Sequence, residues 1–235
     1  PAIHNAAFSA AGIRGTYVKL PTPEAEVPLL PQVMESYGIE GLNVTIPHKQ
    51  AVLSFLKTLS PAAEKIGAVN TITKNLEGDN TDWIGIAETL DRFSPKDKNV
   101  LLLGAGGAAF AAAYYFAERG AKLSITNRTA EKAEALAARF GGTAVPLSSL
   151  KPEYDIVLNA SPVCPAEPAA FIKAGCVVMD MVYPDSPFLE AARTLGAETF
   201  SGETMLIHQG AAAFAKWHGI SPDISAMENA FREAE

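Results

Sequence analysis

A glycine-rich segment is the first part of this 235-residue chain whose residue types point to a specific chemistry. Residues 100–109, VLLLGAGGAA, have Gly104, Gly106 and Ala109 at the spacing of a dinucleotide-binding turn between a strand and a helix. Gly104 allows the tight turn, Gly106 lets the backbone approach a pyrophosphate, and Ala109 lets the helix pack closely on the strand. The N–H groups at the start of that helix then face the phosphates. The residues expected to bind the cofactor here are Gly104, Ala105, Gly106, Gly107 and Ala108.

The end of the next predicted strand indicates which dinucleotide binds. Asn127, Arg128 and Thr129 lie where an NAD-binding turn usually has an Asp or Glu for the ribose 2′-hydroxyl. A guanidinium group instead forms charge-assisted hydrogen bonds to a 2′-phosphate. Arg128 is alternatively a solvated charge, but a cation at a helix N-terminus opposes the helix dipole unless an anion binds there. The sequence therefore predicts NADP, bound by these three residues.

Polar side chains gather at the ends of strands in the first third of the chain. In GLNVTIPHKQ (41–50), an apolar alternating run stops at a proline and presents Asn43, Thr45 and Lys49 around one chain reversal. The segments GAVNT (67–71) and GDNTD (78–82) likewise put polar groups at strand ends. Together they predict a polar pocket for a small molecule.

These segments, with GAGGA, NRT and MLIHQGA (205–211), resemble the shikimate dehydrogenase family in order and spacing over essentially the whole chain. The resemblance implies reversible reduction of 3-dehydroshikimate to shikimate with NADPH, a step of aromatic amino-acid biosynthesis. It implies that Lys49 and Asp82 form the catalytic pair. The other implied positions are Thr45, Asn70 and Gln209 for the ring hydroxyls, Asn43 supporting the strand end, Tyr183 contacting substrate, and Met181 and Gly202 beside the nicotinamide.

The chemistry explains why such a pair is useful. Oxidation of an alcohol releases a hydride and a proton, and an adjacent amine and carboxylate titrate as one coupled pair that exchanges this proton. The sequence leaves open which of the two is the formal base. It also leaves open simpler roles: Lys49 as a solvated charge, Asp82 as a helix N-cap, Asn70 as a turn cap, and Gln209 bonded to neighbouring backbone.

Composition limits the other functions. A hydrophobic content of 48% and a charged content of 19% are typical of a soluble globular protein, and a net charge of −7 argues against binding to nucleic acid or an anionic membrane. The four histidines lack zinc-like spacing, so no metal is expected. Cys164 and Cys176 lie outside any C-x-x-C pattern, which suits a reducing cytoplasm. The uncharged run 99–117 is split by glycines, and we expect a buried strand and helix there instead of a membrane span.

Periodicity predicts an α/β fold. We expect strands at 15–20, 41–46 and 67–74, helices at 26–38, 49–59 and 81–93, and a turn at 77–79. From residue 99 onward, strands and helices alternate regularly, which predicts a doubly wound parallel sheet of the Rossmann type. Two helices end the chain.

The expected domains are an α/β substrate-binding and catalytic domain and an NADP-binding domain. The first comprises 1–84 plus 206–235, and the second 85–205, with a linker helix at 82–93 and a polar break at 94–98. We expect the terminal helices to pack on the first domain and the active site to lie in the cleft between the two. The resemblance also implies a strand and a serine pair before Pro1 that bind the substrate carboxylate. It further implies a different lid over the cofactor, because 159–168 is short.

The sequence leaves several alternatives open. The nearest is a quinate/shikimate dehydrogenase of broad specificity, and a methylenetetrahydrofolate-type dehydrogenase shares the two-domain plan. A non-catalytic NADP-binding sensor is the alternative from another class. The sequence fits a monomer or a homodimer equally.

Overall fold

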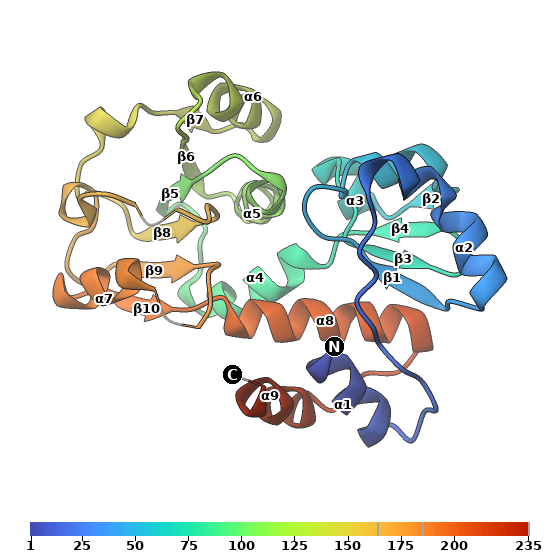
Figure 1. Cartoon of the computed structure of the whole chain (residues 1–235). Coiled ribbons are helices and arrows are strands. Elements are labelled where there is room, and N and C mark those ends of the chain that lie inside the picture. The colour runs from blue at the N-terminus through green and yellow to red at the C-terminus, as the bar shows by residue number, and fades with distance from the viewer. Residues whose placement is uncertain (164, 185, 235) are drawn as a thin grey trace. The chain divides into compact units, whose positions relative to one another are not determined.

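The computed structural model describes residues 1–163, 165–184 and 186–234 and divides into two compact units (Figure 1). The first unit joins residues 1–85 to 206–235, and the second comprises 86–205. Cys164 lies outside the described residues, and Cys176 is buried with a free thiol.

The second unit is built on a six-stranded sheet in the order β10-β9-β8-β5-β6-β7, in which all pairs are parallel. The strands are β5 (Asn99–Leu103), β6 (Lys122–Thr126), β7 (Thr143–Ala144), β8 (Ile156–Asn159), β9 (Val177–Asp180) and β10 (Glu198–Phe200). Counted from β5, the spatial order is 3-2-1-4-5-6, which confirms the predicted doubly wound sheet. The helices of this unit are α5 (Gly107–Glu118), α6 (Ala130–Phe140) and α7 (Pro187–Thr194), with short 3-10 turns η3 (Asp91–Phe93), η4 (Leu147–Ser149) and η5 (Pro168–Ala170).

Apolar runs explain why the central strands lie where they do. All four residues of β8 and of β9 are buried, as are the last four of β5, which is the pattern of parallel strands covered on both faces. On α5, buried alanines let the helix lie close to the sheet. The uncharged run 99–117 thus forms β5 and most of α5. Among the described residues, no helix is long and apolar enough to cross a membrane.

The first unit contains a four-stranded sheet in the order β1-β3-β4-β2. Its strands are β1 (Gly41–Asn43), β2 (Thr58–Leu59), β3 (Thr71–Thr73) and β4 (Glu77–Asp79). Strand β3 pairs antiparallel with both β1 and β4, and β2 pairs parallel with β4. The other elements of the N-terminal part are α1 (Ala2–Ala10), η1 (Glu24–Leu29), α2 (Leu30–Tyr37), η2 (Ala51–Phe55), α3 (Pro61–Ile66) and α4 (Asp82–Leu90), which continues into the second unit.

The C-terminal helices return to the first unit, as expected. Helices α8 (Glu203–His218) and α9 (Ile224–Glu233) share a core with α1, seen beside α9 in Figure 1. The buried members of this core are Ile3, Ala7, Phe8, Ile207, Ala211, Phe214, Met227 and Phe231. Trp217 ties α8 to the sheet, because its indole N–H donates a 3.0 Å hydrogen bond to the carbonyl oxygen of Ile72.

Three local predictions were wrong. Residues 15–20 form no strand, because the backbone of Tyr17 pairs with the side chain of Asn5 (2.7 and 3.1 Å) instead of a neighbouring strand. The segment 49–59 is a 3-10 turn followed by β2, since its last residues extend to pair with β4. Residues 77–79, expected as a turn, are β4 itself.

Candidate active site

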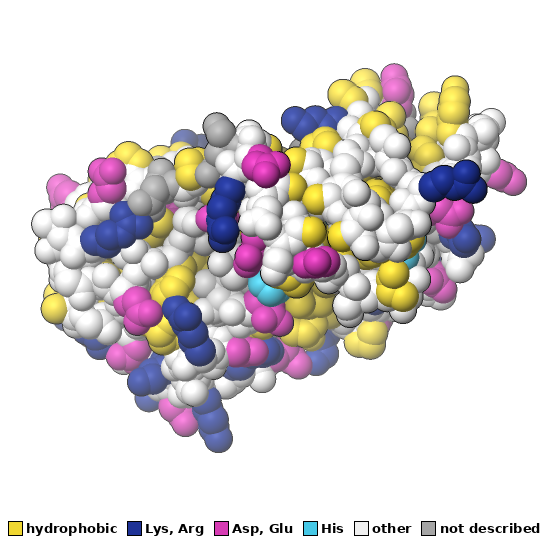
Figure 2. All heavy atoms as spheres, turned by 90° about the horizontal axis from the view of Figure 1, so that it is seen from below, with side chains coloured by type: hydrophobic (Ala, Val, Ile, Leu, Met, Phe, Trp, Pro, Cys, Tyr) yellow, Lys and Arg dark blue, Asp and Glu magenta, His cyan; other side chains and the backbone are white. Residues whose placement is uncertain are grey.

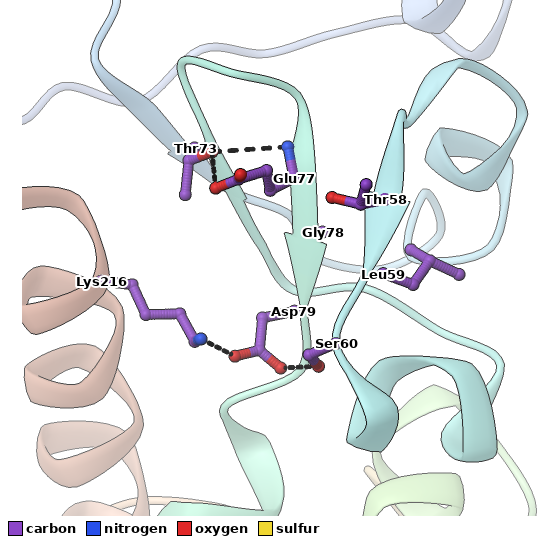
Figure 3. Close-up of a pocket in the computed structure, with 8 residues that line it drawn as sticks. All are labelled: Thr58, Leu59, Ser60, Thr73, Glu77, Gly78, Asp79 and Lys216. Carbon is purple, nitrogen blue, oxygen red and sulfur yellow. Dashed lines mark hydrogen bonds and ion pairs between the residues drawn. The ribbon is translucent and has the colours of Figure 1, made fainter.

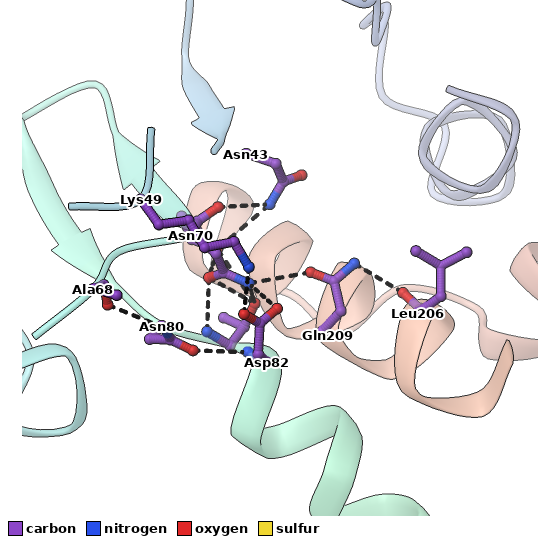
Figure 4. Close-up of polar contacts among 10 residues, drawn as sticks. Asn43, Lys49, Ala68, Asn70, Asn80, Asp82, Leu206 and Gln209 are labelled. Atoms are coloured by element: carbon purple, nitrogen blue, oxygen red, sulfur yellow. Dashed lines mark hydrogen bonds and ion pairs between the residues drawn. The ribbon is translucent and has the colours of Figure 1, made fainter. Parts of the chain in front are cut away.

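Lys49 and Asp82 form an ion pair in the first unit (Figure 4). The Lys49 ammonium nitrogen lies 2.5 Å from Oδ2 of Asp82, and their side chains are only 13% and 7% exposed. Lys49 lies in the turn after β1, where its carbonyl oxygen accepts a 2.8 Å hydrogen bond from the Val69 N–H. Asp82 is the first residue of α4. An ammonium group has three N–H donors, so this contact leaves donors of Lys49 for a ligand oxygen.

Asn70 is the centre of the surrounding network. Its buried amide nitrogen donates to Oδ1 of Asp82 at 2.8 Å, to the Thr81 hydroxyl at 3.0 Å and to Oε1 of Gln209 at 3.3 Å. Its amide oxygen accepts from the Thr81 backbone N–H at 2.8 Å. Because an amide nitrogen has only two hydrogens, the three bonds compete, and the longest, to Gln209, is the weakest. Asn70 is therefore held in one orientation beside a contact that a ligand can replace.

Gln209 reaches this network from α8. Its amide nitrogen donates a 2.9 Å hydrogen bond to the Leu206 carbonyl oxygen on the preceding turn, while its oxygen faces Asn70. Gln209 therefore makes both contacts: the bond to neighbouring backbone that the sequence left open, and the contact to Asn70. Figure 4 shows the side chain of Gln209 pointing from its helix toward Asn70 and Asp82.

Asn43 supports the end of β1, as expected. Its amide nitrogen lies 3.3 Å from the carbonyl oxygen of Asn70, and its amide oxygen accepts a 2.9 Å hydrogen bond from the Tyr17 hydroxyl. Burial raises the pKa of Tyr17, so this hydroxyl keeps its proton and remains a donor. Thr45 is exposed, and no hydrogen bond from its side chain to the described members of the network is seen.

Asn80 is a member of this site that sequence reasoning missed. It is fully buried, accepts the Asp82 backbone N–H at 3.1 Å, and donates to the Ala68 carbonyl oxygen at 3.0 Å. It therefore ties the start of α4 to the backbone of Ala68. The available signal was the polar run 79–82 at the end of β4, in which only Asp82 was expected to act. Tyr17 was missed because it fell in a wrongly predicted strand.

The glycine-rich turn lies at the carboxyl end of β5 in the second unit. Gly104 has a φ of +108°, and a Cβ there would lie 3.2 Å from the Ala160 carbonyl carbon at the end of β8. Gly106 is the N-cap of α5 and supplies no side chain to the helix start. A Cβ on Gly106 would meet nothing within 4 Å. The open space in front of the uncapped N–H groups of α5 fits a pyrophosphate.

The segment Asn127–Thr129 follows β6 and leads into α6. The Asn127 amide nitrogen donates a 3.0 Å hydrogen bond to the Thr129 carbonyl oxygen, which folds the turn. Arg128 is exposed, and the Thr129 side chain does not cap α6. An exposed guanidinium beside an uncapped helix N-terminus fits a phosphate group.

Met181 and Gly202 lie together beyond β9 and β10. The Gly202 N–H donates a 3.2 Å hydrogen bond to the Val182 carbonyl oxygen, and a Cβ on Gly202 would overlap the Met181 backbone. Tyr183 follows in the same turn and is 46% exposed. All the cofactor positions named from the sequence thus lie at the carboxyl edge of one parallel sheet, where dinucleotides bind in doubly wound folds.

A buried pair that the sequence did not single out holds this edge. The Asn159 amide nitrogen donates to Oδ1 of Asp180 at 3.0 Å, and the same oxygen accepts the Val182 N–H at 3.1 Å. Ser186 donates to the other carboxylate oxygen at 2.6 Å. Asn159 ends β8 and Asp180 ends β9, and a polar residue at the end of an apolar strand was the sequence signal for this pair.

Charges on the face in Figure 2 are mixed in sign, with Lys and Arg side chains lying among Asp and Glu side chains. Within the described ranges, no group of three His, Cys, Asp or Glu residues is arranged to hold a metal ion.

Three family models match the chain. They are the shikimate dehydrogenase substrate binding domain over residues 1–72, shikimate/quinate 5-dehydrogenase over 87–165, and the shikimate 5′-dehydrogenase C-terminal domain over 202–230.

Individual relatives agree along the whole chain. A shikimate dehydrogenase (NADP(+)) from Moorella thermoacetica is 36% identical, covering 100% of this chain and 88% of its own length. The Methanocaldococcus jannaschii protein of the same name is 37% identical, covering 98% and 90%. The structure of Thermus thermophilus shikimate 5-dehydrogenase in complex with NADP(H) and shikimate superposes with a TM-score of 0.91 at 37% identity, covering 100% of this chain and 94% of that one.

Proposed function

The chain belongs to the shikimate dehydrogenase family, and from this premise we propose how its residues carry out the NADP-dependent interconversion of 3-dehydroshikimate and shikimate. The observation that carries the proposal is the nearly buried ion pair between Lys49 and Asp82. As an oxidoreductase acting on a CH–OH group, the protein must move a proton whenever a hydride moves, and this pair is built to exchange one.

Lys49 exchanges the proton with the substrate oxygen. In the direction of reduction, its ammonium group donates a proton to the carbonyl oxygen, and in the reverse direction the Lys49–Asp82 pair takes the proton back. Asp82 holds the ammonium at 2.5 Å and is itself held by Asn70 and by its backbone bond to Asn80. When bound, the nicotinamide supplies or accepts the hydride.

Asn70, Gln209 and Thr45 bind the ring hydroxyls. The 3.3 Å contact between the Asn70 amide nitrogen and the Gln209 amide oxygen has a donor on one side and an acceptor on the other. A hydroxyl group is both acceptor and donor, so one ring hydroxyl can replace this contact by accepting from the Asn70 amide nitrogen and donating to the Gln209 amide oxygen. Tyr183 supplies a further substrate contact.

The cofactor is NADP, held through the carboxyl edge of the six-stranded sheet. The proposed contacts are the pyrophosphate at Gly104–Ala108, the 2′-phosphate at Asn127, Arg128 and Thr129, and the nicotinamide beside Met181 and Gly202. Residues 1–84 with 206–235 then act as the substrate-binding and catalytic domain, and 85–205 as the NADP-binding domain.

We further propose that the protein works in the cytoplasm as a monomer or homodimer without binding nucleic acid. The free, buried thiol of Cys176 and the net charge of −7 support this setting. Analytical ultracentrifugation gives the oligomeric state directly.

The deciding experiment follows absorbance of the reduced nicotinamide with NADP or NAD, each paired with shikimate or quinate. We expect rapid turnover with NADP and shikimate. Equal turnover with quinate would replace the proposal by a broad-specificity enzyme, and NADP binding without turnover on any substrate would make the chain a sensor.

A further inference from the structure

Gln209 and Lys216 lie on the same face of α8. They are seven residues apart, which is two helical turns and about 10 Å along the axis. Gln209 meets Asn70, and Lys216 meets Asp79 at the end of β4. One helix face therefore touches the polar strand ends of the first unit at two points.

The second point is an ion pair (Figure 3). The Lys216 ammonium nitrogen lies 2.5 Å from Oδ2 of Asp79, with side chains 41% and 11% exposed. The other carboxylate oxygen of Asp79 accepts from the Ser60 hydroxyl and, at 2.7 Å, from the Asn80 backbone N–H. The pair lines a solvent-open pocket of about 250 Å³ beside β2 and β4. Asp79 is thus firmly held, whereas Lys216 reaches it from the helix.

Asp79 is also connected directly to the catalytic network. Its carbonyl oxygen accepts a 3.0 Å hydrogen bond from the Asn70 backbone N–H. The next residue, Asn80, accepts the backbone N–H of Asp82. The segment that anchors Lys216 therefore also positions both Asn70 and Asp82.

We propose that Lys216 and Asp79 are positioning residues for substrate binding. Their ion pair sets the rotation and axial position of α8, so that the Gln209 amide reaches the ring hydroxyl held by Asn70. The inference rests on the proposed role of Gln209 and adds the ion pair that positions this side chain.

The helix does not depend on the pair for its attachment. The apolar side of α8 is buried against α1 and α9, and Trp217 bonds to Ile72. A partly exposed ion pair contributes little to stability. Loss of the pair should leave α8 folded and attached, but its rotation about the helix axis should be less closely fixed. The position of the Gln209 side chain should therefore change more than the stability of the fold.

The test is Lys216→Met, which removes the charge and keeps the aliphatic stem. Lys74→Met is the matched control, because Lys74 forms a 2.8 Å ion pair with Glu40 in the same unit, 60% and 59% exposed and outside the network. We expect Lys216→Met to raise KM for shikimate about three- to tenfold. KM for NADP should stay unchanged, Tm should match the control, and Lys216→Arg should restore KM.

A double mutant separates this inference from the proposed function. If Lys216 acts through Gln209, Lys216→Met has no further effect on KM for shikimate in a Gln209→Ala background. The positioning role would be overturned if the two substitutions raised KM for shikimate by independent factors that multiply in the double mutant. An unchanged KM in Lys216→Met would overturn it too. If Gln209→Ala itself leaves KM for shikimate unchanged, the proposed substrate contact fails instead.

Discussion

Asn70 and Asp82 are joined by a 2.8 Å hydrogen bond from the Asn70 amide nitrogen to Oδ1 of the carboxylate. The bond uses one oxygen of Asp82 and leaves Oδ2 for the Lys49 ammonium. Asn70 in turn is fixed by the Thr81 backbone N–H. The direction of the Asp82 carboxylate, and with it the place of the Lys49 nitrogen, is thus set by the main chain at the start of α4.

Replacing Lys49 by Met tests the proton transfer. We expect turnover to fall about 10²- to 10⁴-fold, the range that positioned acid–base groups contribute, while NADP affinity is retained. Steady-state kinetics measures both quantities. Lys57→Met, at an exposed position eight residues further along the chain, should behave as the unmodified protein. A Lys49→Met protein that lost substrate affinity but kept its turnover would show that Lys49 only binds.

Replacing Arg128 by Gln tests the choice of cofactor. Charge-assisted hydrogen bonds contribute about 1.5–3 kcal/mol, so we expect NADP to bind about ten- to a hundredfold more weakly and NAD to bind as before. Titration calorimetry with both dinucleotides gives the ratio. Lys132→Gln, which removes an exposed cation in the first turn of the following helix α6, is the control. Equal weakening of NAD and NADP would remove Arg128 from the 2′-phosphate site.

Two glycines in one turn should respond differently to alanine. Gly106 faces open space with a φ of −90°, so Gly106→Ala should fold normally and lose dinucleotide binding, because its Cβ occupies the approach to the phosphates. Gly104→Ala should lose about 1–3 kcal/mol of stability, since its φ of +108° is strained for alanine. Thermal denaturation and NADP titration of both proteins separate the effects. Unimpaired NADP binding by Gly106→Ala would exclude the pyrophosphate from this turn.

His4 should make stability depend on pH. Burial lowers the pKa of His4 from 6.5 to about 4 in the folded chain. Between these values the unfolded chain binds a proton that the folded chain does not, so the stability that neutral His4 contributes is present above pH 6.5 and lost toward pH 4. The difference corresponds to about 3 kcal/mol.

Urea denaturation between pH 5 and 7 measures this slope. His4 stacks on Tyr17 at 4.3 Å, so His4→Phe keeps a ring in place and should flatten the slope. An unchanged slope in His4→Phe would assign the pH dependence to other groups.

The parallel sheet was predictable because its strands are continuous apolar runs and its turns carry glycine at defined spacing. The sheet of the first unit was less predictable, because its strands are only two or three residues long and depend on side chains distant in sequence. The bond between Asn5 and Tyr17 that replaces the expected strand at 15–20 joins positions 12 apart, which local periodicity does not register.

Polar residues at the ends of apolar runs predicted a polar pocket that includes Asn43, and the roles expected for Asn70 and Asp82 came from the family resemblance. Asn80 and Asp79 were missed although they are close to Asp82 in sequence. Their roles depend on contacts with Ala68 and Lys216, which come together only in the folded chain. The partner of Asp79 is Lys216, a residue that in the sequence is one polar position on an alanine-rich helix. Nothing in local composition distinguishes it from a solvated lysine.

The interrupted first unit has a consequence for synthesis. Phe8 and Ile3 pack against side chains from Ile207 onward, and the 120 residues of 86–205 are made in between. At about 5–20 residues per second, synthesis of this second unit alone adds roughly 6 to 24 seconds before the packing partners of α1 are made. During that interval the apolar face of α1 is available to chaperones, while the six-stranded parallel sheet can already fold.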